Sequence, residues 1–320
     1  MNQALSKGNR RLAGALCEEA FLGAVQLEWD PVEAPQHGER FSFGGVGFEV
    51  LVDPSVAGWE LASEHLSCLA SLDTRVGAHV LCSVTADPSL DDRPFSREIR
   101  WEWGGTRAQL ETARVDAMLT RLSHGRYAAT ARIVPDSNGA SSLVTALASA
   151  IVSREGGVML HASGIELDDG VVLFIGPSGA GKTTACNRAP GARAFTRDRA
   201  AVVPCATSPT GWAAWRMPGG DEIALPSSHD AMRPLLGILR VRRGDDGVSL
   251  QTRASVSAVV LLRESAQSGG RTEEDEQRHV RSLLALATAV PIGELRSVLS
   301  ASLTGPVREW LERPSRERWR

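Results

Sequence analysis

The sequence predicts an α/β protein of the α+β kind, with a mostly-β N-terminal domain over residues 1–135, a second domain with a mixed sheet over residues 136–313, and a tail over residues 314–320. Three observations predict this division. Short strand-like runs fill the first part. Near residue 136 a turn is followed by a stretch rich in alanine and leucine with helical spacing. A glycine-rich loop then follows an apolar run and precedes a helix.

The composition excludes several classes of protein. Hydrophobic residues make up 42% and charged residues 23% of the chain, as in ordinary globular proteins. The 35 basic and 38 acidic residues leave a net charge of -3, so no broad basic field exists to hold nucleic acid. The five cysteines are scattered singly, which argues against disulfides and against zinc. No run approaches the about 20 apolar residues of a membrane span. We therefore expect a cytoplasmic protein with neither a nucleic-acid nor a membrane partner.

In the first domain, four runs are predicted as strands, at residues 41–52, 97–103, 109–121 and 126–134. Pro135 ends the last of them. Helices are expected over residues 4–27 and 58–72. This domain carries no motif that points to a chemical activity.

In the second domain, the predicted helices span residues 141–153, 182–188, 253–262, 276–289 and 306–312. The predicted strands span residues 157–166, 171–175, 194–198, 200–204, 235–241 and 290–296. Asp169-Gly170 lies between the first two strands, and an Asp-Gly pair between apolar runs is a strong signal for a β-hairpin.

The glycine-rich loop matches the pattern of a phosphate-binding loop (P-loop) without deviation. It comprises Gly176, Pro177, Ser178, Gly179, Ala180, Gly181, Lys182 and Thr183, followed by Thr184. Glycines let backbone N–H groups approach phosphate oxygens that a side chain would block. Lys182 is expected to contact the β- and γ-phosphates of ATP, and the Thr183 hydroxyl is expected to bind Mg²⁺. The loop predicts binding of a nucleoside triphosphate but does not say what happens to the γ-phosphate.

Downstream signatures of common P-loop classes are absent from the sequence. There is no Asn-Lys-x-Asp for guanine, no Leu-Ser-Gly-Gly-Gln of transporter ATPases, and no apolar run ending in Asp-Glu after the loop. The distinctive feature lies upstream, since the strand before the loop is predicted to be the second strand of a hairpin. If Asp169 and Gly170 are the turn residues, His161 lies opposite Ser178. A histidine there could stabilise charge or move a proton, or it could simply cap a strand, and both readings stay open.

The segment Met159-Leu-His161-Ala-Ser, followed by the loop Gly-Pro-Ser-Gly-Ala-Gly-Lys-Thr, resembles the kinase domain of HPr kinase/phosphorylase, and still more the divergent HPr-kinase-like proteins of peptide-biosynthesis gene clusters. The resemblance spans roughly residues 140–310. It implies a phosphoenolpyruvate-carboxykinase-like P-loop kinase domain. It also implies that His161 is the active-site histidine, that Lys182 and Thr183 contact triphosphate and Mg²⁺, and that a homo-oligomer is one option.

The same resemblance implies a pair of aspartates about 15 residues after the loop. Asp198 matches the second of them, whereas Arg197 stands where the family has the first, the presumed base for the acceptor hydroxyl. Arginine stays protonated and cannot serve as a base. Either Asp198 combines the roles of base and metal contact, or transfer is impaired. A lone aspartate at a strand end is also often only a turn residue.

These observations lead to one principal hypothesis. The chain is expected to be an ATP- and Mg²⁺-dependent kinase that phosphorylates a hydroxyl, most simply a serine of a protein or peptide. Its catalytic residues would be His161, Lys182 and Asp198, and its metal contacts Thr183 and Asp198. Two alternatives remain: a nucleotide-binding partner protein without catalytic activity, and a kinase of a small metabolite.

Overall fold

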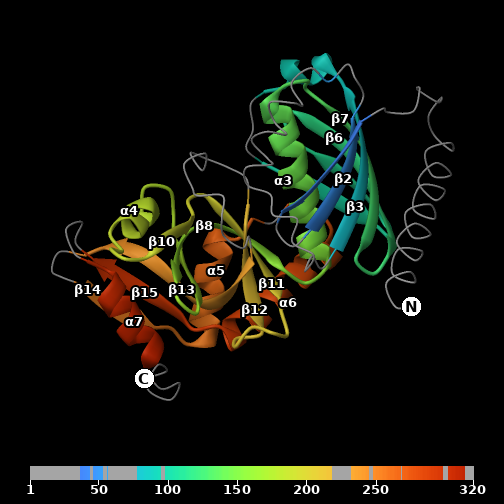
Figure 1. The fold of residues 1–320 in the computed structure, drawn as a ribbon. Helices are drawn as coiled ribbons and strands as arrows, with labels where there is room; N and C mark the ends of the chain where they lie inside the picture. Colours follow the sequence, from blue (N-terminus) through green and yellow to red (C-terminus); the bar gives the residue numbers. More distant parts are fainter. Residues whose placement is uncertain are drawn as a thin grey trace, which may run out of the picture.

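The computed structural model describes residues 37–43, 46–52, 56, 78–94, 98–217, 232–244, 248–267, 269–297 and 302–313. These residues form two mixed β-sheets with helices packed on them (Figure 1). The protein is therefore of mixed α and β structure, as the sequence predicts. Predicted helices at residues 4–27 and 58–72, and the tail, lie outside the described residues.

The first sheet has seven strands in the order β1-β2-β3-β7-β6-β5-β4. Their bounds are β1 His37–Phe43, β2 Val46–Val52, β3 Ala78–Ala86, β4 Arg100–Gly104, β5 Arg107–Glu111, β6 Val115–Ser123 and β7 Arg126–Ile133. A short 3-10 helix, Pro88–Asp92, follows β3. Strands β2, β3 and β7 run parallel, while the other neighbours are antiparallel.

Helix α3, Ser137–Arg154, covers one face of this sheet (Figure 1). The Asp136 side chain caps its first turn by accepting a hydrogen bond from the Gly139 N–H at 2.6 Å. Its apolar residues join one buried cluster with residues from the sheet, such as Leu110 and Leu119. The same cluster includes Met159 and Trp215 of the second sheet, so α3 connects the two cores.

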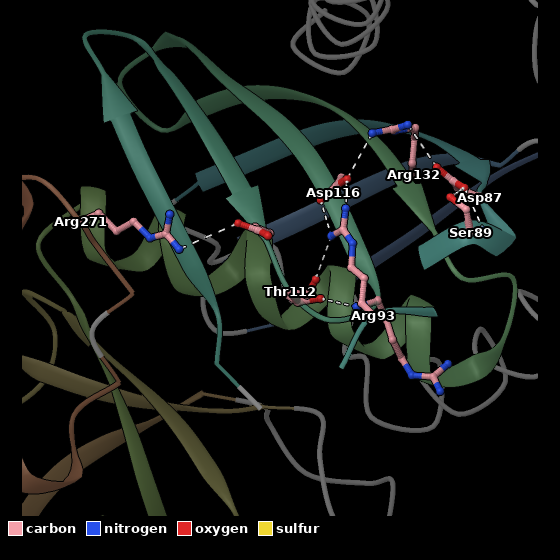
Figure 2. Close-up of polar contacts among 9 residues, drawn as sticks. Asp87, Ser89, Arg93, Thr112, Asp116, Arg132 and Arg271 are labelled. Atoms are coloured by element: carbon pink, nitrogen blue, oxygen red, sulfur yellow. Dashed lines mark hydrogen bonds and ion pairs between the residues drawn. The ribbon is translucent and has the colours of Figure 1, made fainter. Parts of the chain in front are cut away.

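Charged side chains link strands β6 and β7 to the segment that follows β3 (Figure 2). Arg93 binds both carboxylate oxygens of Asp116, at 2.8 and 2.7 Å. Arg132 contacts Asp116 at 3.2 Å and Asp87 at 3.1 Å. Since each carboxylate of this network has an arginine partner, we assign it a structural role rather than a binding site.

The second sheet has eight strands. Their bounds are β8 Val158–Leu167, β9 Gly170–Ile175, β10 Arg193–Thr196, β11 Arg199–Pro204, β12 Trp212–Arg216, β13 Met232–Arg243, β14 Val248–Thr252 and β15 Ile292–Ser297. Strand β9 pairs antiparallel with β8 and parallel with β13, and β13 pairs parallel with β15. Pairing from β8 through β11, β12, β13 and β9 returns to β8, so five strands form a closed ring.

Helices cover both faces of this sheet. Helices α5, Ser255–Ser265, and α6, Glu273–Ala289, share a buried cluster with one face. Helices α4, Lys182–Asn187, and α7, Thr304–Glu312, share a cluster with the other. In Figure 1, α4 and α7 lie at the end of this unit away from the first sheet. Among the described helices, none has the length and apolar character needed to cross a membrane.

Several expectations about local structure were wrong. The predicted single strands at residues 41–52 and 109–121 each span parts of two antiparallel strands, β1 and β2 in the first case and β5 and β6 in the second. Strands β3, β12 and β14 were not predicted. In the β8–β9 hairpin the turn residues are Asp168 and Asp169, because Leu167 pairs with Gly170. Gly170 is the first residue of β9. Only glycine fits there, because a Cβ would lie 2.3 Å from the carbonyl oxygen of Pro234 on the neighbouring β13.

The two sheets are also joined at the edge strand β4. The Trp101 N–H donates to the carbonyl of Gly269 at 2.8 Å, and the Arg271 N–H donates to the carbonyl of Trp101 at 3.1 Å. The Arg271 side chain extends toward Glu111 of the first sheet, 3.9 Å away (Figure 2). The segment before α6 is thus tied to the first sheet by backbone hydrogen bonds. The predicted domain boundary at residue 135 remains a prediction, because α3 contacts both units.

Candidate functional site

The candidate site is built around the loop that joins β9 to α4. Pro177, Ser178 and Gly179 are exposed at its tip, and Thr183 is exposed at the start of α4. Gly179 and Gly181 have φ values of 76° and 95°, which side chains other than glycine adopt poorly. Space within 4 Å of the Gly179 Cβ position is open, so the loop backbone is accessible to a ligand. The exposed Thr183 hydroxyl can serve as a cation ligand.

Lys182 is folded into this loop. Its ammonium donates to the carbonyls of Gly176 at 2.9 Å and Pro177 at 3.2 Å, and the residue is only 7% exposed. Burial lowers the pKa of Lys182, while the negative charge of Asp198 acts in the opposite direction. The carboxylate and the ammonium are therefore close enough to interact electrostatically across the site.

The start of the loop is fixed from the helix on the opposite side of the sheet. The N–H of Gly176 donates to the Ser265 hydroxyl at 3.1 Å, in a buried position at the end of α5. The neighbouring Glu264 binds Arg240 at 2.5 Å, and Arg240 pairs with Ile175, the last residue of β9. These contacts could not be predicted from local patterns, because 89 residues separate Ser265 from Gly176.

His161 and Asp198 lie together, as the hypothesis requires. Their Nδ1 and Oδ1 atoms are 3.3 Å apart, and Arg199 Nε lies 3.3 Å from the other carboxylate oxygen. All three side chains are half-buried. Arg199 is therefore a partner of the candidate acid.

The pairing of β8 explains this arrangement. Residues Val158 to His161 pair with β11, whereas Ala162 to Leu167 pair with β9 and β10. Arg197 and Asp198 lie between β10 and β11, where β8 changes partner. The Asp198 carbonyl accepts from the Ala162 N–H at 3.0 Å, and the Arg197 carbonyl accepts from the Ser163 hydroxyl at 2.9 Å. These bonds hold Asp198 beside His161.

The predicted position of His161 opposite Ser178 is wrong by two residues. In the hairpin Ala162 pairs with Ile175, and His161 itself pairs with Arg199 of β11. The error arises at the hairpin turn, because Gly170 was expected to be a turn residue and is instead the first residue of β9. His161 therefore faces Asp198 more directly than it faces the tip of the loop.

Asp198 is held in its ionised form. Its pKa is lowered, first by hydrogen bonding from His161 and further by the charges of Arg199 and Lys182, although burial acts against this. An ionised carboxylate only accepts hydrogen bonds, so Asp198 can receive the proton of a hydroxyl group or bind a cation.

The loop residues fit a polyphosphate with Mg²⁺. A Cβ at Gly176 would lie 3.3 Å from both the Ala180 Cβ and the Val241 carbonyl oxygen, so the loop is compact and needs glycine here. No group of three or more His, Cys, Asp or Glu with metal-binding geometry occurs among the described residues. Mg²⁺ on nucleotides is usually bound by one or two protein ligands together with phosphates and water, and the oxygens of Thr183 and Asp198 are of the type that Mg²⁺ prefers.

Comparison with known proteins gives no further identification. No family model matches the chain, and no curated protein matches its sequence at a significant level. The function must therefore be inferred from the residues and their geometry.

Proposed function

We propose that the second unit is an ATP- and Mg²⁺-dependent kinase of the HPr-kinase-like type, with a phosphoenolpyruvate-carboxykinase-like nucleotide fold, that phosphorylates a serine hydroxyl of a protein or peptide. The observation that carries this proposal is the Lys182 ammonium folded into a complete P-loop and electrostatically coupled to Asp198. The hairpin that leads into the loop, with His161 on its first strand, supports the suggested fold.

The lysine content of the chain supports a functional role for Lys182. Of the 35 basic residues, two are lysines, Lys7 and Lys182, and the rest are arginines. A sequence that uses arginine almost everywhere thus has lysine at the position where a P-loop needs a compact ammonium. The broader guanidinium of arginine would not fit the two carbonyl contacts at 2.9 and 3.2 Å in the same way.

In the proposed reaction, the acceptor oxygen attacks the γ-phosphorus of ATP, the bond from that phosphorus to the bridging oxygen breaks, and ADP leaves. Lys182 and the loop amides neutralise charge on the phosphate oxygens. Thr183 and Asp198 would hold Mg²⁺, which adds positive charge to the same oxygens. Asp198 orients the acceptor hydroxyl and receives its proton, and His161 keeps the carboxylate in place. A weakly basic carboxylate suffices, since phosphoryl transfer depends mainly on positioning and charge.

One observation favours a second candidate, a nucleotide-binding protein without transfer activity. Arg197 stands at the position of the first aspartate of the family, and Asp198 is already bound by His161 and Arg199. In that case the chain binds ATP tightly but transfers nothing.

Labelled ATP and an arrayed library of serine peptides separate these functions. The wild-type chain is expected to transfer label, and Asp198→Asn is expected to lower transfer about 100-fold or more while ATP affinity changes little. Lys182→Ala is expected to weaken ATP binding about 10- to 100-fold, through loss of charge-assisted hydrogen bonds. Asp168→Asn, an exposed acid in the turn of the same hairpin, serves as the control.

Wild-type binding without transfer to any peptide would support the silent partner, and transfer to a small alcohol alone would support a metabolite kinase. Full transfer by Asp198→Asn would contradict the proposed mechanism.

A further inference from the structure

A cluster of arginines lies at the same edge of the second sheet as the P-loop. Strands β9, β13 and β15 run parallel, so their carboxyl ends meet at one edge, where ligands commonly bind. Arg240 pairs with Ile175 on one side and with Glu294 on the other. Two residues further along, Arg242 pairs with Arg296. The residues beside the loop are therefore strongly basic.

Glu294 is the centre of this cluster. Its side chain is only 4% exposed and contacts three arginines: Arg296 at 2.9 Å, Arg242 at 3.2 Å and Arg253 at 3.3 Å. Burial, the largest single effect, raises the pKa of Glu294, but the three arginines together more than offset it, so that its pKa lies below the ordinary value. Glu294 is thus a fixed negative charge that orients three guanidinium groups.

The cluster carries more positive charge than Glu294 needs. Among the residues that the structure describes, one carboxylate neutralises one guanidinium of the cluster, which leaves an excess of two positive charges. The arginine side chains are also accessible, with 47% of Arg242, 32% of Arg253 and 52% of Arg296 exposed. They come from β13, from β15 and from the residue that follows β14, so they form an open surface rather than a closed pocket.

This surface adjoins the loop. A Cβ at Gly176 would lie 3.3 Å from the carbonyl oxygen of Val241, and one at Gly181 would lie 4.0 Å from the Val241 side chain. Arg242 is the next residue in β13, and its side chain, like that of Arg240, which binds Glu264 of α5, points to the opposite face of the sheet from Val241. A group bound at the arginines would therefore lie near the edge that carries the loop, on the face of the sheet that α5 covers.

We propose that Arg242, Arg253 and Arg296, oriented by Glu294, form a surface site that binds carboxylates of an acidic peptide segment of the acceptor. The assignment of the segment to an acceptor rests on the proposed kinase function, whereas the binding of an acidic peptide does not. An extended peptide fits an open surface, and two of its carboxylates match the excess of two positive charges.

Peptide affinity measured without nucleotide tests this surface site. The probes are fluorescent synthetic peptides, Glu-Glu-Ser-Glu-Glu and its counterpart with glutamine for each glutamate, and inorganic phosphate is the competitor. The acidic peptide is expected to bind more tightly than the glutamine peptide. Arg242→Gln and Arg296→Gln are each expected to raise its Kd about threefold to fivefold, as for exposed ion pairs. Each variant leaves two arginines on Glu294, so the fold is expected to persist.

Arg263→Gln is the matched control, because it removes an exposed arginine of α5 that pairs with Glu276. Its peptide affinity is expected to equal that of the wild-type chain. Equal binding of the two peptides, or wild-type affinity in both cluster variants, would overturn the proposal. Displacement of the acidic peptide by low concentrations of phosphate would overturn it too, in favour of a phosphorylated ligand. Loss of ATP binding with retained peptide binding would count against the kinase and not against the surface site.

Discussion

At the scale of single residues, the buried ammonium of Lys182 is the most important feature of the proposed site. Removing an ammonium from water costs free energy, and here two carbonyl oxygens and the charge of Asp198 offset only part of that cost, since the pKa of Lys182 remains lowered. The phosphates of a nucleotide would supply the missing negative charge. The partly compensated ammonium of Lys182 would therefore favour binding of a polyanion at the loop, in addition to the effect of the glycines.

The second residue-scale feature is the carboxylate of Asp198, which makes stability depend on pH. Its pKa in the folded protein is below the about 3.9 of an unfolded chain. The ionised group therefore stabilises the fold above that value, and the contribution is lost as the pH falls through the folded pKa. We expect Asp198→Asn to lower the free energy of unfolding near neutral pH, by an amount that shrinks below about pH 4.

Urea unfolding at a series of pH values measures this difference. Asp168→Asn, whose side chain is 82% exposed, should show little difference at any pH. A difference for Asp198→Asn that stays constant from neutral to strongly acidic pH would mean that the ion pairs with His161 and Arg199 do not lower the pKa.

At the scale of elements, the site depends on how β8 changes partners. Its first half pairs with β11 and its second half with β9 and β10, and His161 is the last residue before the change. At this junction the Asp198 carbonyl still accepts from the Ala162 N–H, while the Asp198 carboxylate faces the histidine.

The sequence predicted the parts of this site that are contiguous along the chain. The eight loop residues, the hairpin and the strand near residue 196 all follow from local patterns, and the helices at 141–153 and 276–289 follow from periodicity. The hairpin register could not be predicted, because the role of Gly170 depends on its approach to Pro234 on a distant strand. The cluster around Glu294 could not be predicted either, because its arginines come from separate parts of the chain.

Ser265 provides the element-scale prediction. Ser265→Ala leaves the buried N–H of Gly176 without its partner, which we expect to cost about 1–3 kcal/mol of unfolding free energy and to weaken ATP binding through a less fixed loop. Denaturant unfolding and ATP titration measure the two effects. Ser123→Ala, at an exposed position of β6, should change neither. If Ser265→Ala also changes neither, α5 does not hold the loop.

At the scale of the whole molecule, the two sheets are joined at two places. Helix α3 shares its buried cluster with both, and the segment before α6 hydrogen-bonds to β4 through Trp101. Arg154 of α3 adds to the joint, since it lies over the Trp103 ring at 4.8 Å and 3.7 Å from Glu274. The first unit therefore packs against the second through a shared core and backbone hydrogen bonds.

Gly269→Ala tests this joint. A Cβ there would lie 2.3 Å from both the Ile99 carbonyl oxygen and the Trp101 ring, so we expect a loss of about 1–3 kcal/mol in the free energy of unfolding. Gly104→Ala, in the edge strand β4 that Gly269 contacts but with no atom within 4 Å of the added Cβ, is the control and should not destabilise the protein. Equal stability of the two variants would show that the contact with β4 is dispensable.

Whether Lys182 contacts the phosphates of bound ATP is tested by labelling with an acyl-phosphate derivative of ATP. This reagent acylates an amine beside the bound phosphates and releases ATP. With only two lysines in the chain, mass spectrometry of the digested protein assigns the label without ambiguity. The account predicts an acyl group on Lys182 and not on Lys7, and its suppression by excess ATP with Mg²⁺. An unlabelled Lys182, or labelling of both lysines that ATP does not reduce, would contradict it.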